Sequence, residues 1–324
     1  MTYRFTSRSG IVVERSAHAL DENDKLDDLL GRLDHERGAY FSSGVEYPDR
    51  YSRWDFGFIS PPLEVVSLGS TLSVNALNGR GEAILELLAP LLIDGEDVEV
   101  EAREAGTLRL AVRPSERPFT EEERSLQPSV FGPLKRLIED FAGIEESFLG
   151  LFGAFGHDLI FQFDPIELRL DRSGVRKDMH LYLPDRIHVI DRRLGTAHRF
   201  DFEFSKGKVG TAGLARDPVT VAAPAAKGRA RKGDIVSDQT EDEYAAKVDA
   251  TREYIVAGDV FELVLSRRFS APCDRAPSAL FRQMREINPS PYEFLIQFGD
   301  EQLIGASPEM FIRVEGDRVE SSPI

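Results

Sequence analysis

Two glutamates lie in segments where a carboxylate could do chemistry, and the first of these is Glu309. It ends the segment GASPE (305–309), in which small residues leave room for a ligand and Pro308 fixes the backbone just before the acid. A carboxylic acid held rigidly in a confined space can be tuned towards general-acid catalysis. A residue that only caps a turn explains the same spacing, so the residues by themselves leave both roles open.

The second glutamate, Glu262, lies inside the apolar run 260–269, which predicts a strand with both faces buried. A carboxylate inside such a strand is costly unless it is paired or has a function. We therefore expect Glu262 either to bond a cation such as Arg267 or Arg268, or to line a cavity.

A third rigid segment, NPSPY (288–292), contains two prolines. Their fixed φ angles and missing N–H groups leave carbonyls and a hydroxyl in a preset geometry, which suits an ammonium group. An ordinary turn from a helix to a strand explains the same residues, and the residues alone favour that interpretation.

Composition excludes several classes of function. The net charge is -16 over 324 residues, which disfavours nucleic acid, and we interpret the basic cluster 227–232 as a solvated linker. No apolar run is long enough to cross a membrane or to serve as a signal peptide. The single cysteine, Cys273, fits a reducing cytoplasm, and the six histidines lack metal-ligand spacing.

The elements that must position these segments follow from periodicity. Short β-rich runs alternate unevenly with isolated helices, which favours a largely antiparallel α+β fold over regular βαβ units. The predicted strands are 39–43, 56–59, 63–68, 71–76, 108–112, 149–152, 179–183 and 187–190, and the predicted helices are 25–33, 81–92 and 133–141.

A stretch rich in Ala, Pro, Gly and Lys at 216–239 predicts a linker between an N-terminal region, 1–215, and a second region, 240–324. In the second region, Thr240 and Glu243 form a capping-box pair that opens a helix ending at Gly258. We further predict a helix over 277–287 and strands over 292–298 and 302–306, joined by a hairpin.

Three ordered motifs carry a family resemblance: GDVFELVLSRRF (258–269), NPSPYEF (288–294) and IGASPEMF (304–311). Together they resemble the chorismate-binding family, and most closely component I of anthranilate synthase. Two earlier segments, 41–65 and 150–164, are similar to the rhizobial-type enzymes, in which this component is fused to a glutamine amidotransferase. The resemblance covers nearly the whole chain.

The resemblance implies a fold of two packed antiparallel sheets with helices outside, and separate pockets for substrate and inhibitor. The implied reaction replaces the 4-hydroxyl of chorismate by ammonia at C2 and then eliminates pyruvate, with Mg2+ holding the substrate. Glu309 matches the acid that protonates the departing hydroxyl. Glu262 matches a position that is lysine in relatives that add water, so an isochorismate or salicylate synthase is disfavoured.

The resemblance also implies a tryptophan site that inhibits the enzyme. Ser43 matches the serine of an N-terminal LLES motif, although Ser42 replaces its glutamate. Glu293 departs from the usual methionine of NPSPYMF. The other residues that match the inhibitor site are Asn288, Pro289, Ser290, Pro291, Tyr292 and Phe294.

In the family, an AGT segment, the metal-binding glutamates and a catalytic histidine follow the position of Ile324, so we expect no metal ligands within these residues and a truncated, inactive chain. Two alternatives stay open. One is the phenazine-type aminodeoxyisochorismate synthase, which aminates the same substrate but retains its pyruvyl group. The other is a non-catalytic module that binds tryptophan.

Overall fold

The computed structural model describes residues 2–20, 26–44, 53–115, 117, 119–144, 146–167, 177–222 and 235–321. The chain divides into two compact units, Met1–Ala222 with Pro277–Ile324, and Ala223–Ala276. The sequence predicted boundaries at 215 and 239 and grouped residues 277–324 with 240–276. In the structure, residues 277–324 belong to the first unit instead. Part of the predicted linker and the basic cluster 227–232 lie outside the described residues.

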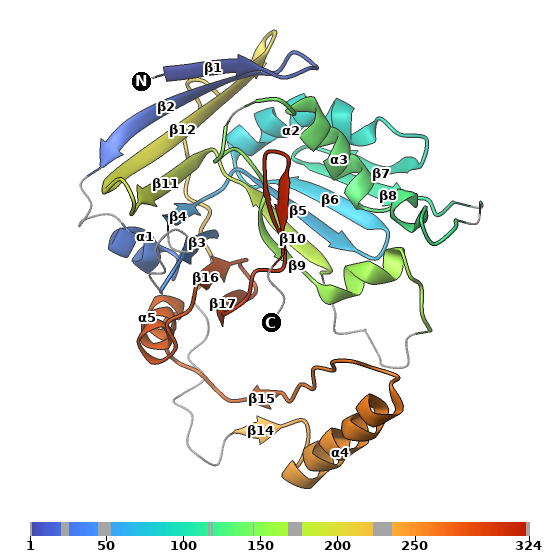
Figure 1. Ribbon diagram of the computed structural model, residues 1–324. Coiled ribbons are helices and arrows are strands. Elements are labelled where there is room, and N and C mark those ends of the chain that lie inside the picture. The colour runs from blue at the N-terminus through green and yellow to red at the C-terminus, as the bar shows by residue number, and fades with distance from the viewer. Residues whose placement is uncertain are drawn as a thin grey trace. The chain divides into compact units, whose positions relative to one another are not determined.

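The larger sheet of the first unit has nine strands within the described residues, and every neighbouring pair is antiparallel. Figure 1 shows segments from both ends of the chain meeting in it, where β16 and β17 follow β3. In spatial order the strands are β1 (Thr2–Thr6), β2 (Val12–Leu20), β12 (Thr196–Lys206), β11 (Arg186–Asp191), β4 (Trp54–Ile59), β3 (Gly38–Ser42), β16 (Tyr292–Gln297) and β17 (Gln302–Ser307), with β13 (Val209–Gly210) paired to β12.

The smaller sheet has six antiparallel strands within the described residues. Its spatial order is β7 (Val98–Glu104), β8 (Thr107–Val112), β6 (Thr71–Ala76), β5 (Leu63–Leu68), β10 (Met179–Leu183) and β9 (Phe152–Phe155). A separate two-stranded hairpin, β18 (Arg313–Glu315) and β19 (Arg318–Glu320), follows near the end of the chain.

The two sheets pack against each other through a shared apolar cluster. Tyr182 of β10 contributes to it from the smaller sheet, and Ala39 of β3, Phe58 of β4 and Ile296 of β16 contribute from the larger one. All four side chains are less than 5% exposed. The predicted α+β architecture of two packed antiparallel sheets is therefore confirmed.

Helices cover the opposite face of the larger sheet at the β3–β16 end. Leu33 follows α1 (Leu26–Arg32) and Phe281 lies in α5 (Pro277–Ile287), and both pack on Tyr40 and Leu295. Because side chains alternate along a strand, Tyr40 and Leu295 point away from the face that carries Ala39 and Ile296. The helices α2 (Gly79–Ile93) and α3 (Phe131–Asp140) pack in the main core, and short 3-10 turns span Arg124–Leu126 and His157–Gln162.

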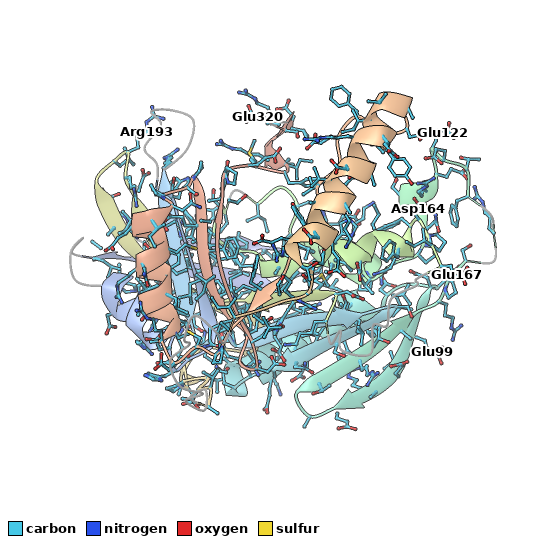
Figure 2. The ribbon with its side chains drawn as sticks, turned by 90° about the horizontal axis from the view of Figure 1, so that it is seen from below. Glu99, Glu122, Asp164, Glu167, Arg193 and Glu320 are labelled. Carbon is cyan, nitrogen blue, oxygen red and sulfur yellow. The ribbon has the colours of Figure 1, made fainter. Side chains whose placement is uncertain are left out.

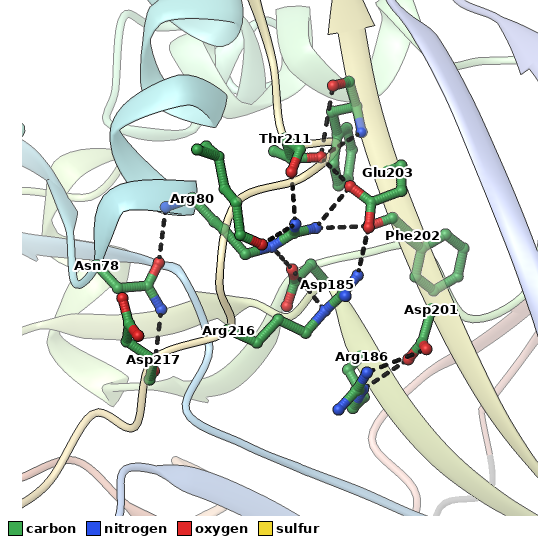
Figure 3. Close-up of polar contacts among 12 residues, drawn as sticks. Asn78, Arg80, Asp185, Arg186, Asp201, Phe202, Glu203, Thr211, Arg216 and Asp217 are labelled. Carbon is green, nitrogen blue, oxygen red and sulfur yellow. Dashed lines mark hydrogen bonds and ion pairs between the residues drawn. The ribbon is translucent and has the colours of Figure 1, made fainter.

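A buried arginine fixes the start of α2 to the larger sheet (Figure 3). The side chain of Arg80 is 1% exposed and forms an ion pair with Asp185. Its other N–H groups donate to Glu203 at 3.0 Å, to the carbonyl of Thr211 at 2.7 Å and to the carbonyl of Phe202 at 3.1 Å. Every acceptor belongs to the protein itself, so we assign this charged cluster a structural role, which is to hold α2 against the larger sheet.

Most predicted elements are present with ends shifted by one or two residues, and the hairpin joining β16 to β17 is confirmed. The strand predicted at 149–152 lies instead at Phe152–Phe155. Four strands of five or more residues were missed, although apolar and polar residues alternate in two of them, Val98–Glu104 and Thr196–Lys206, as in a half-buried strand. The four are β1, β2, β7 and β12.

The second unit holds α4 (Glu241–Ala257) and the two-residue strands β14 (Val236–Ser237) and β15 (Phe269–Ser270). The predicted capping box of α4 is confirmed, because Glu243 N donates to Thr240 Oγ1 at 3.2 Å and Glu243 Oε2 accepts from Thr240 N at 2.8 Å. Gly258 ends the helix at a φ of 81°. No residue of α4 is buried.

Many charged side chains of the first unit are exposed to solvent. Figure 2 shows Glu99, Glu122 and Asp164 at the periphery of this unit, in keeping with the net charge of -16. Within the residues described, the structure contains no helix that is both long and apolar enough to cross a membrane.

Candidate functional site

One hairpin carries two of the three motifs singled out in the sequence. NPSPY leads into β16, and GASPE ends β17. The turn between them contains Gly299 at a φ of 102°, and the Phe298 N–H donates to the carbonyl of Glu301 at 2.9 Å. The register places Tyr292 opposite Ser307, so the rigid turn and the acidic segment lie at the same end of the hairpin.

The N-terminal segment around Ser43 lies beside this turn. Strand β3 pairs antiparallel with β16, and just past the end of that ladder Gly44 N donates to the carbonyl of Ser290 at 2.8 Å. Ser43 and Ser290 are each 3% exposed. The structure thus brings together two segments about 250 residues apart, as the family resemblance implied.

Two carbonyls of the turn already accept hydrogen bonds from the protein, so they are less available to an ammonium group than the sequence suggested. The Ser290 carbonyl already accepts from Gly44 N, and the Asn288 carbonyl accepts from Ser290 Oγ at 3.2 Å. Asn288 and Pro289 are exposed. The remaining predicted residues, Pro291, Tyr292 and Phe294, are half-buried.

A buried carboxylate that the sequence did not select ties the two segments together. The Glu293 side chain is 0% exposed and accepts from Arg285 Nε at 2.7 Å. It also accepts from Ser42 Oγ at 3.1 Å and from Ser290 N at 3.2 Å. Ser42 and Glu293 are the two positions that depart from the family motifs, and they are direct partners across the ladder. The paired departure was the only signal in the sequence.

A second ion pair lies on the other side of Ser43. Its N–H donates to Asp55 Oδ1 at 3.3 Å, and Arg192 holds the other carboxylate oxygen at 2.5 Å. Asp55 is 4% exposed. No motif pointed to Asp55 or Arg192, because the contact depends on how β3, β4 and β11 are ordered in the sheet.

The open space predicted at Gly305 is filled by a neighbouring side chain. A Cβ atom added there would lie 2.7 Å from both Cε atoms of Phe294, and the ring itself covers the position. The glycine therefore accommodates an aromatic ring of the same hairpin, where the sequence suggested room for a ligand.

The proposed acid, Glu309, lies exposed in a tight turn after β17. Ser307 Oγ donates to the Glu309 carbonyl at 3.2 Å and accepts from the Glu309 N–H at 3.4 Å. These bonds fix the backbone of Glu309. Within the described residues its carboxylate has no hydrogen bond or ion pair.

The expectation for the segment of Glu262 was wrong. Residues 260–268 form no strand, and Phe261 is 99% exposed and Glu262 exposed. A strand requires a partner for its N–H and carbonyl groups, and among the described residues of this unit only β14 and β15 pair with each other. Glu262 makes no ion pair with Arg267, whose Nε donates to Ser237 Oγ at 2.9 Å instead.

The described residues contain no group of three or more His, Cys, Asp or Glu side chains that could hold a metal ion. They therefore do not fit an all-protein site for the Mg2+ that the resemblance implies. A cavity of about 540 Å³ lies beside α3, but its lining is mainly apolar and includes none of the predicted site residues.

The sequence profile of the chorismate binding enzyme family matches residues 96–324 of this chain. The chain belongs to this family. The matched range covers all three motifs, so the segments that carry Glu262, Glu309 and the rigid turn lie within the part of the chain that matches the family.

Named relatives agree with this membership. The chain is 40% identical to an anthranilate synthase from Azospirillum brasilense over 99% of its own length and 43% of the relative's. It is 31% identical to anthranilate synthase component 1 from Escherichia coli K12, over 82% of this chain and 52% of that protein. Among solved structures, anthranilate synthase component I from Streptococcus pneumoniae aligns with a TM-score of 0.48 and 20% identity, over 85% of this chain and 55% of that one. The chain spans about half the length of the curated relatives it matches.

Proposed function

We propose that this chain forms part of an anthranilate synthase component I, which converts chorismate and ammonia to anthranilate, pyruvate and water. The observation that carries the proposal is 40% identity over 99% of the chain to a protein named anthranilate synthase. The three motifs lie in the same chain. Ammonia would come from a glutamine amidotransferase domain or subunit, and the expected location is the cytoplasm.

In this proposal Glu309 protonates the departing hydroxyl of chorismate, and Glu262 lies near the position that receives ammonia. The chain contributes a fixed backbone at Glu309 through its two bonds to Ser307. Mg2+ would hold the substrate carboxylate. Because the described residues offer no cluster of metal ligands, we derive no step through the ion.

We further propose that the segments around Ser43 and 288–294 bind tryptophan as an inhibitor. The support is geometric, since Gly44 bonds Ser290 and the buried Glu293 joins Ser42 to the turn. A difference in burial favours a second candidate function for this chain alone, a non-catalytic amino-acid-binding module. The proposed inhibitor serines are buried, whereas Glu309 and Glu262 are exposed.

A chimera tests the catalytic proposal, with residues 1–324 replacing the matched region of the Azospirillum brasilense anthranilate synthase. Supplied with chorismate, ammonia and Mg2+, it should release anthranilate and pyruvate in equal amounts. Amination without pyruvate would favour the phenazine-type alternative. A folded chimera that binds tryptophan but turns over no chorismate would favour the binding module.

A further inference from the structure

A cavity of about 540 Å³ lies between α3, the residues that follow this helix and strand β10 of the smaller sheet. Leu134 and Leu137 of α3 and Leu181 of β10 form part of its wall, and each is 8% exposed or less. A cavity of about 150 Å³ with such a lining stays free of water and binds benzene. Small-molecule sites span roughly 300–1,000 Å³. The cavity beside α3 is therefore large enough for a ligand of two or more rings.

The cavity reaches the surface of the first unit through apolar side chains. Ile138 of α3 and Phe155 of β9 belong to its lining, yet they are 65% and 61% exposed. Large apolar side chains that stay exposed around a depression are typical of ligand-binding sites. An apolar ligand can therefore enter from water along this side.

One buried carboxylate interrupts the apolar lining. The side chain of Glu146 is 2% exposed, whereas that of Lys135, also in the lining, is 72% exposed. Glu146 Oε1 accepts from Phe148 N at 3.3 Å, and Oε2 forms an ion pair with Arg15 Nη1 at 3.0 Å. Within the described residues, Oε2 nevertheless accepts no hydrogen bond. Because a buried acceptor without a donor is costly, a ligand that donates to Oε2 would gain affinity.

The charges beside Glu146 favour a neutral ligand. Arg15 already balances the carboxylate, and its guanidinium lies 4.8 Å from the centroid of the Phe200 ring. A cationic ligand would bring a second positive charge beside Arg15 and would lose its hydration in an apolar cavity. A ligand carboxylate would be repelled by Glu146. An uncharged N–H or O–H group satisfies the carboxylate oxygen without either cost.

We propose that this cavity binds a neutral, flat aromatic molecule whose N–H or O–H group donates to Glu146 Oε2. Indoles and phenols have this chemistry. The site is distinct from the proposed inhibitor site, because its lining includes no residue of 41–44 or 288–294. The inference goes beyond the proposed function and does not depend on it, since binding here requires no turnover of chorismate.

Calorimetry with indole and 1-methylindole on the 324-residue chain tests the role of the donor. Both molecules have the same two rings, but 1-methylindole has no N–H group. Indole should bind roughly tenfold more tightly, as expected for one hydrogen bond. In Glu146→Met the two ligands should bind with equal affinity, because the acceptor is gone. Glu139→Met is the matched control, since Glu139 is an exposed carboxylate of α3 outside the lining.

A second pair of variants tests the place of binding. Leu137→Trp fills part of the cavity, so the affinity for indole should fall by roughly tenfold or more. Leu126→Trp is the control, because Leu126 is 66% exposed and does not line the cavity. Ser43→Ala should leave the affinity for indole unchanged, which separates this cavity from the proposed inhibitor site.

Each outcome decides a different point. If neither indole nor 2-naphthol binds the parent chain, the cavity does not serve this class of ligand. If indole and 1-methylindole bind the parent equally well, Glu146 receives no donor and the proposal is wrong. If indole binds Leu137→Trp as tightly as the parent, it occupies another site. Should Leu137→Trp fail to fold, the two ligands compared on the parent and on Glu146→Met still decide the question.

Discussion

The hydroxyl of Ser42 donates a 3.1 Å hydrogen bond to Glu293 across the β3–β16 ladder, and it thereby joins the two halves of the proposed inhibitor site. The same carboxylate is held by Arg285 Nε at 2.7 Å. Glu293 is 0% exposed at its side chain, whereas Arg285 is 32% exposed. The cost of breaking the pair therefore depends on which partner is removed.

Arg285→Ala should destabilise the protein more than Glu293→Met does. Loss of the arginine leaves a buried carboxylate without its cation, which should lower the free energy of unfolding by about 3 kcal/mol. Loss of the glutamate lets Arg285 turn to water but leaves Ser42 Oγ and Ser290 N without an acceptor, at a cost of about 1–2 kcal/mol. Urea unfolding of both variants and of the double variant measures the coupling. Equal effects of the two single changes would contradict this assignment.

Removing the Ser43 hydroxyl should weaken tryptophan binding without unfolding the protein. Ser43 is 3% exposed, so a bulky replacement such as phenylalanine would strain the core, and Ser43→Ala is the cleaner change. We expect a loss of roughly tenfold in affinity by calorimetry, as for one hydrogen bond. The matched control is Ser67→Ala, a serine 1% exposed in β5 of the other sheet. Unchanged affinity in Ser43→Ala would remove Ser43 from the site.

Glu309→Gln should abolish most of the activity of the chimera. Glutamine keeps the shape of the side chain but cannot supply a proton, so the rate of amination should fall on the order of 10²- to 10⁴-fold with little change in chorismate binding. Glu301→Gln, a change in the turn of the same hairpin, is the control. A near-normal rate in Glu309→Gln would show that Glu309 is not the acid and serves only in the turn.

The 324-residue chain by itself should form no anthranilate. Both proposed catalytic carboxylates, Glu309 and Glu262, are exposed to water, and the segment of Glu262 forms no strand. Acid catalysis of this kind needs a carboxyl group held in a confined site. Fluorescence of anthranilate in the presence of chorismate, ammonia and Mg2+ is the measurement, and turnover above background would refute the prediction.

His188 should make the protein less stable in mild acid. Burial, together with the positive charges of Arg186 and Arg199, lowers the pKa of His188 from 6.5 to about 4. Between pH 6.5 and 4 the unfolded chain therefore binds a proton that the folded chain does not. The free energy of unfolding should fall as the pH falls through this window, by up to about 1.4 kcal/mol per pH unit from this residue.

The variant His188→Gln should flatten that dependence, because glutamine does not titrate. His157→Gln is the control, since the His157 side chain is 84% exposed. Thermal or urea unfolding at several pH values between 4 and 7 gives the slopes. If parent and His188→Gln lose stability at the same rate, another group is responsible.

The sequence by itself determined the elements whose signals are local. The capping box of Thr240 and Glu243, the hairpin turn at Gly299 and the strands β5 and β6 depend on neighbours in the chain, and each is present as predicted. The three motifs also identified the family from the sequence, because a motif is recognised by the order of its residues along the chain.

Only the tertiary structure decided which distant groups meet. The bond from Ser42 to Glu293 requires β3 to pair with β16, and the contact of Asp55 with Arg192 requires the order of β3, β4 and β11. Neither pairing has a local signal, because a strand offers the same backbone groups to any partner. The burial predicted around Glu262 failed for the same reason, since a strand pattern becomes a strand only where a partner supplies the other half of the ladder.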